Sequence, residues 1–368
     1  MKSSNSDEEI PSSMNRAPIT PTIPKVSLIV VNYNGVSAME KNFEICFRSL
    51  VNTDYENFDI LFVDNGSSDS SVELVGKIAT RNRNIKIVRC ERNLGIAGAV
   101  KAARRYLSSH TKYIGILNND VIFEPEWLKN AIAALEADGS IAAAYPFIFD
   151  NYTNSAFIGG SIDTFGLFYP RNAEITDSDK GLRRGVKRSP FIAGTVMVLR
   201  ISDYDHVSGL DESFFLFYEE VDLAWRLLIS GRMSILVWNS VVHHLRGQTA
   251  SKIDSRERWY LGTRNRLVMI LKDHDIDYAF ATFAASLLLS FANLLLVDEA
   301  GQRVTSYFRA YLDVMRQIPR IYRERKLIRT YRVLNTRALL RRGLISGPHF
   351  FTMFATTVSD KNWLGSRL

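Results

Sequence analysis

The stretch that decides the fold is Val26-Ser-Leu-Ile-Val-Val-Asn-Tyr-Asn-Gly35, a β-branched run that ends in a polar turn. The same pattern of a short apolar strand with a polar stop returns at residues 58–69, 84–98 and 113–120. Apolar residues at helical spacing separate these strands, over 38–52, 70–81 and from 93 to 108. This alternation is typical of an α/β protein, with a mostly parallel central sheet flanked by helices and right-handed crossovers.

Polar clusters follow the four predicted strands, at residues 32–35, 64–69, 93–98 and 118–120. In open parallel sheets, ligands bind at the carboxyl ends of the strands. We therefore expect the four clusters to converge on one site.

The chain is less regular beyond residue 124. Strands are predicted at 141–145, 191–199 and 235–242, and the polar, basic stretch 171–188 is predicted to be a loop. Residues 1–25 are polar and contain four prolines without a continuous apolar run, which indicates a disordered leader and not a signal peptide.

Composition and charge exclude several classes of protein. The chain is 46% hydrophobic and 23% charged, which is globular and not collagen-like or disordered. Its two cysteines, Cys46 and Cys90, cannot form a disulfide scaffold or a four-cysteine zinc site, and we expect buried thiols in a reducing compartment.

The net charge of the chain is +7, and residues 299–343 alone contribute +9. A near-neutral body argues against a nucleic-acid protein, and the basic C-terminal part favours contact with an anionic surface.

Residues 279–297 are nineteen residues without a charge. Thr282, Ser286, Ser290 and Asn293 recur at helical spacing and predict a polar stripe on one face of a helix. The stripe suits a helix that lies on a membrane surface or packs within the protein better than a lone transmembrane helix. All three alternatives stay open at this stage.

Two groups of residues could bind a metal ion. Asp120 follows a strand and is either a helix N-cap or a ligand of a divalent cation. His243 and His244 end the last predicted strand, where a histidine is either a hydrogen-bonded core residue or a metal ligand.

Three carboxylates follow the aromatic run 214–218. In a helix over 219–230, Asp222 and Arg226 form an i,i+4 ion pair, which makes a structural role for Asp222 the better interpretation. Glu219 and Glu220 begin that helix. Glu220 is either a general base beside a cavity or part of a solvated helix start.

In this order, the motifs resemble glycosyltransferase family 2 of the GT-A fold, and most closely its rhamnosyltransferase- and galactofuranosyltransferase-like branch. The resemblance covers residues 26–272. Its landmarks are residues 30–35, 63–69, 92–98, 117–120, 209–212, 214–226, 243–244 and 264–266. It implies a GT-A domain over 26–272, with a nucleotide-binding half (26–123) and an acceptor-binding half (124–272). The apolar run and the basic residues beyond it predict a helical, basic and membrane-associated region at 273–368.

The resemblance also implies the roles of individual residues. The nucleotide-sugar would be bound by Asn32, Asn34, Asp64, Asn93, Gly95, Asn118, Asn119 and Asp120. Asp120 and His243 would hold Mn²⁺ or Mg²⁺, with His244 as the alternative one residue on. Glu220 would be the catalytic base, with Glu219 as the other candidate, and Asp222 and Arg226 would lie on the acceptor side in a structural role.

The implied activity is inverting, metal-dependent transfer of a sugar from dTDP-rhamnose or a UDP-sugar to a hydroxyl of a glycan or lipid-linked acceptor. We expect the enzyme at the cytoplasmic face of a membrane, bound peripherally to anionic lipid. A nucleotidyltransferase is disfavoured, because residues 32–35 lack the basic, glycine-rich loop that binds a triphosphate. The alternative is a non-catalytic nucleotide-sugar-binding or scaffold protein.

Overall fold

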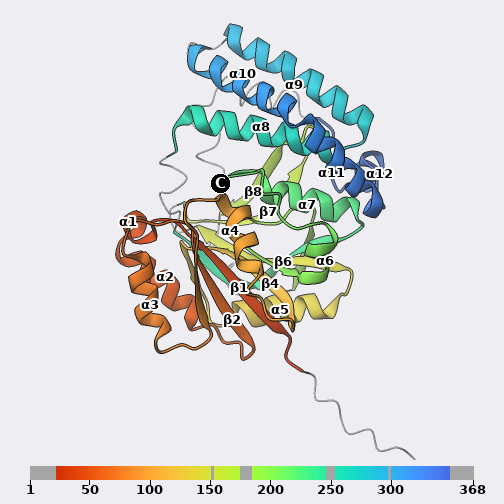
Figure 1. Ribbon diagram of the computed structural model, residues 1–368. Helices are drawn as coiled ribbons and strands as arrows, with labels where there is room; N and C mark the ends of the chain where they lie inside the picture. Colours follow the sequence, from red (N-terminus) through yellow and green to blue (C-terminus); the bar gives the residue numbers. More distant parts are fainter. Residues whose placement is uncertain (1–21, 151–152, 175–184, 246–252, 297–299, 349–368) are drawn as a thin grey trace, which may run out of the picture.

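The structure is a computed structural model, and it describes residues 22–150, 153–174, 185–245, 253–296 and 300–348 (Figure 1). The strands are β1 (Lys25–Asn32), β2 (Phe58–Asp64), β3 (Ile85–Arg89), β4 (Thr111–Asn118), β5 (Val121–Phe123), β6 (Ile141–Asp150), β7 (Ser155–Ile162), β8 (Phe168–Glu174), β9 (Val186–Ser189), β10 (Val196–Arg200) and β11 (Met233–His244). The helices are α1 (Gly35–Met39), α2 (Lys41–Val51), α3 (Ser71–Ala79), α4 (Gly95–Arg104), α5 (Trp127–Ala137), α6 (Ile201–His206), α7 (Glu219–Ile229), α8 (Ser255–Asp273), α9 (Ile276–Leu296), α10 (Ala300–Arg316), α11 (Ile318–Tyr331) and α12 (Thr336–Arg341).

The central sheet has the strand order β3-β2-β1-β4-β10-β6-β11-β5. The strands β3, β2, β1 and β4 are parallel, and so are β6 and β11, whereas β10 and β5 run the opposite way. The predicted α/β fold with a mostly parallel sheet is therefore confirmed. Since six strands of this path point one way, their carboxyl ends lie along the same edge.

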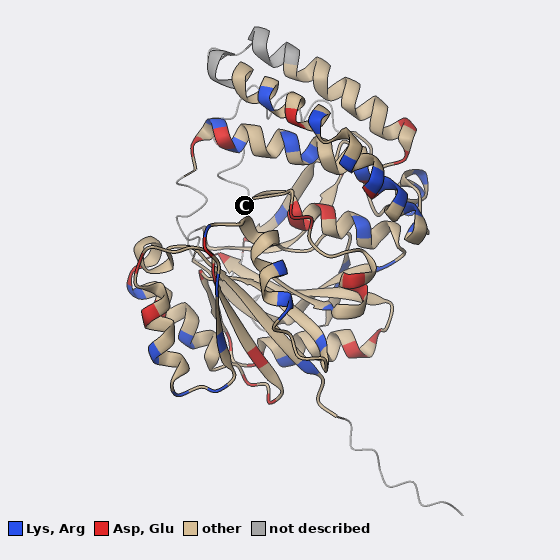
Figure 2. Cartoon of the chain, viewed as in Figure 1, with Lys and Arg blue, Asp and Glu red and all other residues tan. Residues whose placement is uncertain are grey.

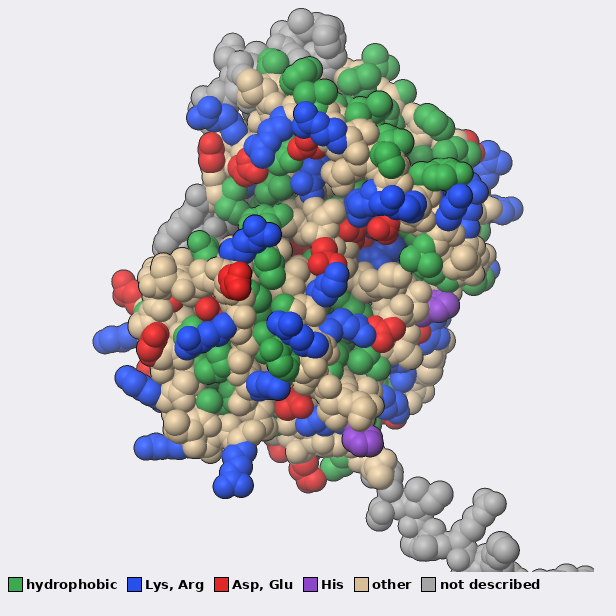
Figure 3. All heavy atoms as spheres, viewed as in Figure 1, with side chains coloured by type: hydrophobic (Ala, Val, Ile, Leu, Met, Phe, Trp, Pro, Cys, Tyr) green, Lys and Arg blue, Asp and Glu red, His purple; other side chains and the backbone are tan. Residues whose placement is uncertain are grey.

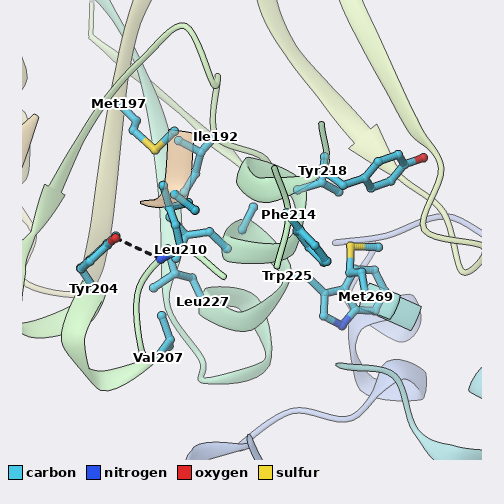
Figure 4. Close-up of a cluster of buried hydrophobic side chains, with 14 of the residues drawn as sticks. Ile192, Met197, Tyr204, Val207, Leu210, Phe214, Tyr218, Trp225, Leu227 and Met269 are labelled. Carbon is cyan, nitrogen blue, oxygen red and sulfur yellow. Dashed lines mark hydrogen bonds between the residues drawn. The ribbon is translucent and has the colours of Figure 1, made fainter. Parts of the chain in front are cut away.

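Side chains alternate between the two faces of the sheet, and each face has its own core. On β1, Leu28 and Val30 pack with α2, α3 and α5, whereas Ile29 packs on the opposite face with α4 and α7. The core that contains Ile29 also includes the buried cluster around Phe214 and around Trp225 of α7 (Figure 4). Burial on both faces explains why these strands are continuously apolar in the sequence.

Two predictions in the second half are wrong at their ends: residues 175–184 of the first lie outside the described part of the chain, and 196–199 of the second form a strand as predicted. The stretch 171–188 was expected to be a loop, but its described ends belong to strands: Arg171 lies within β8 and Arg188 within β9. β8 pairs with β7 alone among the described strands and has no fully buried residue, so its polar residues resemble those of a loop. The strand predicted at 191–199 begins only at Val196, because Phe191 turns away to stack on Phe168 at 3.8 Å between ring centroids.

The C-terminal helices form a layer that packs on α8 (Figure 1). Buried Ala310, Val314, Ile321 and Leu339 join the same core as α7. Within the described residues, no helix is long and apolar enough to cross a membrane. Residues 1–21 of the predicted leader lie outside the described part of the chain, and Lys25, its last predicted residue, is the first residue of β1.

Candidate active site

The polar residues that follow β1 are bound to those that follow β2 and β4. Asn32 Nδ2 donates to Ser67 Oγ at 3.1 Å, and Asn32 Oδ1 accepts from Asn119 Nδ2 at 2.7 Å. Asn34 has a φ of 51°, which allows its Oδ1 to accept from the backbone N–H of Ser68 at 2.8 Å. Three of the four sequence clusters therefore meet, as their places at parallel strand ends predict.

The fourth cluster joins through Asn65, a residue for which no sequence pattern indicated a role. Its Nδ2 donates to Asn93 Oδ1 at 2.9 Å, and its Oδ1 accepts from the N–H of Leu94 at 2.9 Å. Gly95 has a φ of +72°, and a Cβ there would lie 2.2 Å from the carbonyl oxygen of Phe215. The glycine turn thus packs directly against the loop that leads into α7.

Asp64 ends β2 beside this network. It is 5% exposed, and its Oδ1 is buried without a hydrogen-bond partner among the residues that the structure describes. A buried carboxylate oxygen is costly unless something binds it. Asp64 is therefore available to accept a hydrogen bond from a ligand.

The strand end at Asn118 lies next to the turn before β10. The N–H of Asn118 donates to the carbonyl of Thr195 at 2.9 Å. The neighbouring Gly194 lies against Glu220: a Cβ on Gly194 would be 3.3 Å from Glu220 Cγ. Gly194 and Thr195 thus connect the polar cluster 118–120 to the start of α7. No sequence pattern indicated this link.

His244, and not His243, lies beside Asp120. The distance from His244 Nε2 to Asp120 Oδ2 is 3.2 Å, whereas His243 Nε2 lies 3.3 Å from Glu124 Oε1 on the other side of the strand. Successive residues of a strand point to opposite faces, so only one of the two histidines can reach Asp120. The residue next to Asp120 is thus His244, the alternative, and not His243, while a metal-binding role for either histidine stays a prediction.

The pair Asp120 and His244 has donors that suit a divalent cation, one carboxylate and one imidazole nitrogen. No group of three His, Cys, Asp or Glu residues with metal-site geometry occurs in the described ranges. A cation at this pair would thus take its other ligands from phosphate oxygens and water, as Mg²⁺ commonly does at phosphate sites.

Glu219 and Glu220 are both buried at the first turn of α7, with 6% and 7% of their surface exposed. Burial raises the pKa of Glu220 to about 7, although backbone N–H groups at the helix start oppose this shift. Burial and the neighbouring Glu220 raise the pKa of Glu219 well above its ordinary value. The reading of this pair as a solvated helix start is excluded by its burial.

The turn before α7 is strained. Phe217 and Tyr218 both have a φ of 70°, which is unusual for aromatic residues. Asn265 Nδ2 donates to the carbonyls of Leu216 and Phe217, each at 2.8 Å, and so holds the turn. The sequence marked 264–266 only as a family landmark, and the structure shows that Asn265 fixes the loop that presents Glu219.

Asp222 and Arg226 form part of a buried ion cluster. Arg226 Nε donates to Asp222 Oδ2 at 2.9 Å, and Lys272 Nζ lies 2.5 Å from Asp222 Oδ1 and 2.7 Å from Asp211 Oδ2. Burial opposes the charge of Lys272, but Asp222, Asp273 and Asp211 outweigh it and raise its pKa. The cluster anchors α7 to α8 and lines a cavity of about 340 Å³ beside α11, with Asp211, Arg226, Lys272 and Arg320 in its wall.

Comparison with known proteins identifies the domain that carries this site. Residues 27–204 match the family model described as Glycosyl transferase family 2. This chain carries a glycosyltransferase family 2 domain. The family 2 domain model includes the strand-end clusters and Asp120, and ends before α7 and β11.

The family 2 domain has rhamnosyltransferases among its relatives. The chain is 26% identical over 205 residues to an N-acetylglucosaminyl-diphospho-decaprenol L-rhamnosyltransferase of Mycobacterium tuberculosis, a match that covers 50% of this chain and 66% of the relative. It is 28% identical over 97 residues to Rhamnosyltransferase WbbL of Escherichia coli, which covers 25% of this chain and 37% of the relative. The chain thus spans less than two thirds of the length of these relatives.

A solved structure of GalNAc-T7 with UDP, GalNAc and Mn²⁺ resembles this chain with a TM-score of 0.54 at 16% identity. The match covers 81% of this chain and 57% of that one. At this identity the likeness bears on the fold alone, and it confirms the GT-A fold that the sequence motifs implied.

Proposed function

We propose that this chain is an inverting glycosyltransferase. It moves a sugar from a nucleotide-sugar donor, dTDP-rhamnose or a UDP-sugar, to a hydroxyl of a glycan or lipid-linked saccharide in the synthesis of a surface polysaccharide. The family 2 domain and the rhamnosyltransferase relatives support this proposal. The observation that carries it is the buried carboxylate Glu220, packed on Gly194 next to the strand end at Asn118.

Glu220 is the proposed general base. An acceptor hydroxyl oxygen would form the new bond to the anomeric carbon of the sugar, on the face opposite the diphosphate. The bond from that carbon to the diphosphate would break, and its electron pair would leave with the nucleoside diphosphate. Glu220 would take the hydroxyl proton, and a pKa of about 7 suits a base that works near neutral pH.

The strand-end network would bind the donor. Asp64 offers a buried acceptor oxygen, and Asn34, Asn93 and Gly95 stand on the loops around it. Because side chains and backbone at the ends of four strands are already hydrogen-bonded to one another, little would have to move when the donor binds. This preorganisation supports a role in positioning the sugar for attack.

Asp120 and His244 would hold Mn²⁺ or Mg²⁺ together with the donor diphosphate. A bound divalent cation supplies neutralisation of the charge on the leaving nucleoside diphosphate. The presence of Mn²⁺ in the solved GalNAc-T7 structure supports the use of a divalent cation here. Asn118 and Asn119 complete the motif without a carboxylate, so Asp120 would be its one acidic ligand.

This mechanism fits the predicted division of the chain, which stays a prediction: a donor half at 26–123, an acceptor half at 124–272 and a C-terminal helical region at 273–368. Nucleotide sugars are made in the cytoplasm, so we place the reaction at the cytoplasmic face of a membrane. A lipid-linked acceptor would be met there.

The test uses the purified full-length chain and a panel of nucleotide sugars that includes dTDP-rhamnose and UDP-hexoses. A thermal-shift screen finds the donor that raises the melting temperature, and release of nucleoside diphosphate is then measured with a lipid extract, in Mn²⁺, in Mg²⁺ and in chelator. We expect one donor to bind and to turn over only with a cation. Binding without turnover would instead support the non-catalytic scaffold, and a chain that binds no donor would contradict both.

A further inference from the structure

The helix α9 turns its polar residues toward the protein. Thr282 Oγ1 donates to the carbonyl of Thr164 at 3.2 Å, Ser286 Oγ accepts from Arg266 at 3.1 Å, and Ser290 Oγ lies 3.1 Å from the hydroxyl of Tyr311. These three side chains are buried, and the side chain of Asn293, the fourth residue of the stripe, lies outside the described part of the structure. The described part of the polar stripe therefore faces the protein and makes hydrogen bonds within the chain.

The opposite face of α9 is apolar and exposed. Phe280 is 65% exposed and Leu288 is 71% exposed, and Leu287 between them is also on the surface. A helix on the surface of a soluble protein normally shows the reverse arrangement, with its apolar face inward. The amphipathicity of α9 is therefore inverted.

The exposed apolar surface continues onto α10. The ring of Phe283 on α9 meets the ring of Tyr311 on α10 at 5.7 Å, so the two helices lie side by side. Along α10, Val304, Phe308, Leu312 and Met315 are exposed at steps of four, four and three. Twelve of the eighteen large hydrophobic residues exposed in the described chain lie within 276–333. Figure 3 shows hydrophobic side chains gathered over α9, with Lys and Arg side chains beside them. We call this surface of α9 and α10 the apolar face.

Basic residues flank the apolar face on α11 and α12 (Figure 2). Arg323, Lys326, Arg329, Arg341 and Arg342 are exposed, and the structure gives them no ion pair with any residue that it describes. Tyr322 and Leu327 are exposed between them on α11. Apolar insertion beside a cluster of cations is the two-signal arrangement that binds a protein stably to anionic lipid.

We infer that the apolar face and the flanking cations of α11 and α12 dock this chain onto an anionic lipid bilayer, with α9 lying along the membrane surface. Charge complementarity selects anionic lipid, because exposed cations with no ion pair among the described residues flank the apolar face. The inference rests on the proposed function where it concerns the lipid-linked acceptor. It deepens that function, because the bilayer would present such an acceptor at the surface on which the chain docks.

The experiment is sedimentation of the full-length chain with phosphatidylcholine vesicles, with and without phosphatidylglycerol, at low and at high salt. We expect binding that requires phosphatidylglycerol and weakens in high salt. The double variant Phe280→Glu with Leu288→Glu, and the charge variant Arg323→Glu with Lys326→Glu, should each lose at least about tenfold in binding. The matched control is Ile45→Glu on α2, a hydrophobic residue that is 49% exposed outside the C-terminal helices.

Several outcomes would overturn the inference. The chain could stay in the supernatant with anionic vesicles at low salt, or the Phe280→Glu, Leu288→Glu variant could bind like the unmodified chain. Size-exclusion chromatography could instead show a dimer that this variant dissociates, which would make the apolar face a protein interface. The assay needs neither donor nor acceptor, so its failure would leave the proposed sugar transfer standing, and a failed donor assay would leave the vesicle result standing.

Discussion

Glu220→Gln tests the proposed base while keeping the size of the side chain. It removes the group that would take the acceptor proton, and a general base is worth about a hundredfold or more in rate. We expect kcat to fall by at least about a hundredfold, which is ~2.7 kcal/mol of barrier at 1.36 kcal/mol per tenfold. Donor affinity should survive, because Glu220 stands on α7 and not on the loops that would bind the nucleotide.

The pH dependence of the unmodified enzyme follows from the raised pKa. Glu220 must be ionised to act, so kcat should rise with pH through about 7. Its folded-state pKa lies above the ordinary 4.5, so the protonated carboxyl stabilises the fold fully below 4.5, and that stabilisation is lost as pH rises to about 7. The difference corresponds to about 3 kcal/mol in the free energy of unfolding. Glu220→Gln cannot ionise and should be more stable at pH 8 by up to that amount.

Two assays check this prediction. Single-turnover kinetics give kcat against pH, and urea denaturation at pH 5 and pH 8 gives the free energy of unfolding. Glu73→Gln on α3, an exposed carboxylate far from α7 in the chain, is the control for a simple loss of charge. The reasoning is refuted if Glu220→Gln keeps its rate while Glu219→Gln is inactive, which would exchange the two roles, or if the stability gain at pH 8 is absent.

Three further predictions concern the metal pair, the ion cluster and the glycine turn. His244→Ala should lose most of the Mn²⁺ stimulation of donor turnover while His243→Ala keeps it, and a reversed result in metal titrations would restore the original assignment. Lys272→Met removes one of the two cations that bind each of the buried carboxylates Asp211 and Asp222, which keep Arg320 and Arg226. It should lower the free energy of unfolding by about 1–3 kcal/mol in urea denaturation. A loss below about 0.5 kcal/mol would mean that Lys272 does not contribute to anchoring α7. Gly95→Ala is strained by the positive φ of this residue and by the close Phe215 carbonyl, so it should cost about 1–3 kcal/mol of stability and weaken donor binding in thermal-shift titration. Gly139→Ala, which has open space around it, is the control and should change neither. Equal behaviour of the two variants would contradict the close packing at Gly95.

The sequence alone determined the sheet and the convergence of its polar ends. Short, mostly apolar runs such as 58–63, alternating with helical segments, favour buried strands in parallel order, and β1 to β4 follow this pattern. Parallel strands bring their carboxyl ends to one edge, so Asn32, Asp64 and Asn119 were expected on the same edge, and the strand order β2-β1-β4 makes these strand ends neighbours. Local patterns suffice here because each follows from the direction of the chain.

Only the tertiary structure decided which neighbours face one another. The choice between His243 and His244 depends on the register of β11, which shifts between Val237 and Val241, so counting alternate residues along the strand cannot settle it. The pKa of Glu220 depends on its burial, which arises from tertiary packing that includes the contact with Gly194. The same holds for α9: its sequence shows a polar and an apolar side, but contacts with Thr164 and Arg266 turn the polar side inward. Burial and facing arise from contacts between residues far apart in the chain, and no local pattern encodes them.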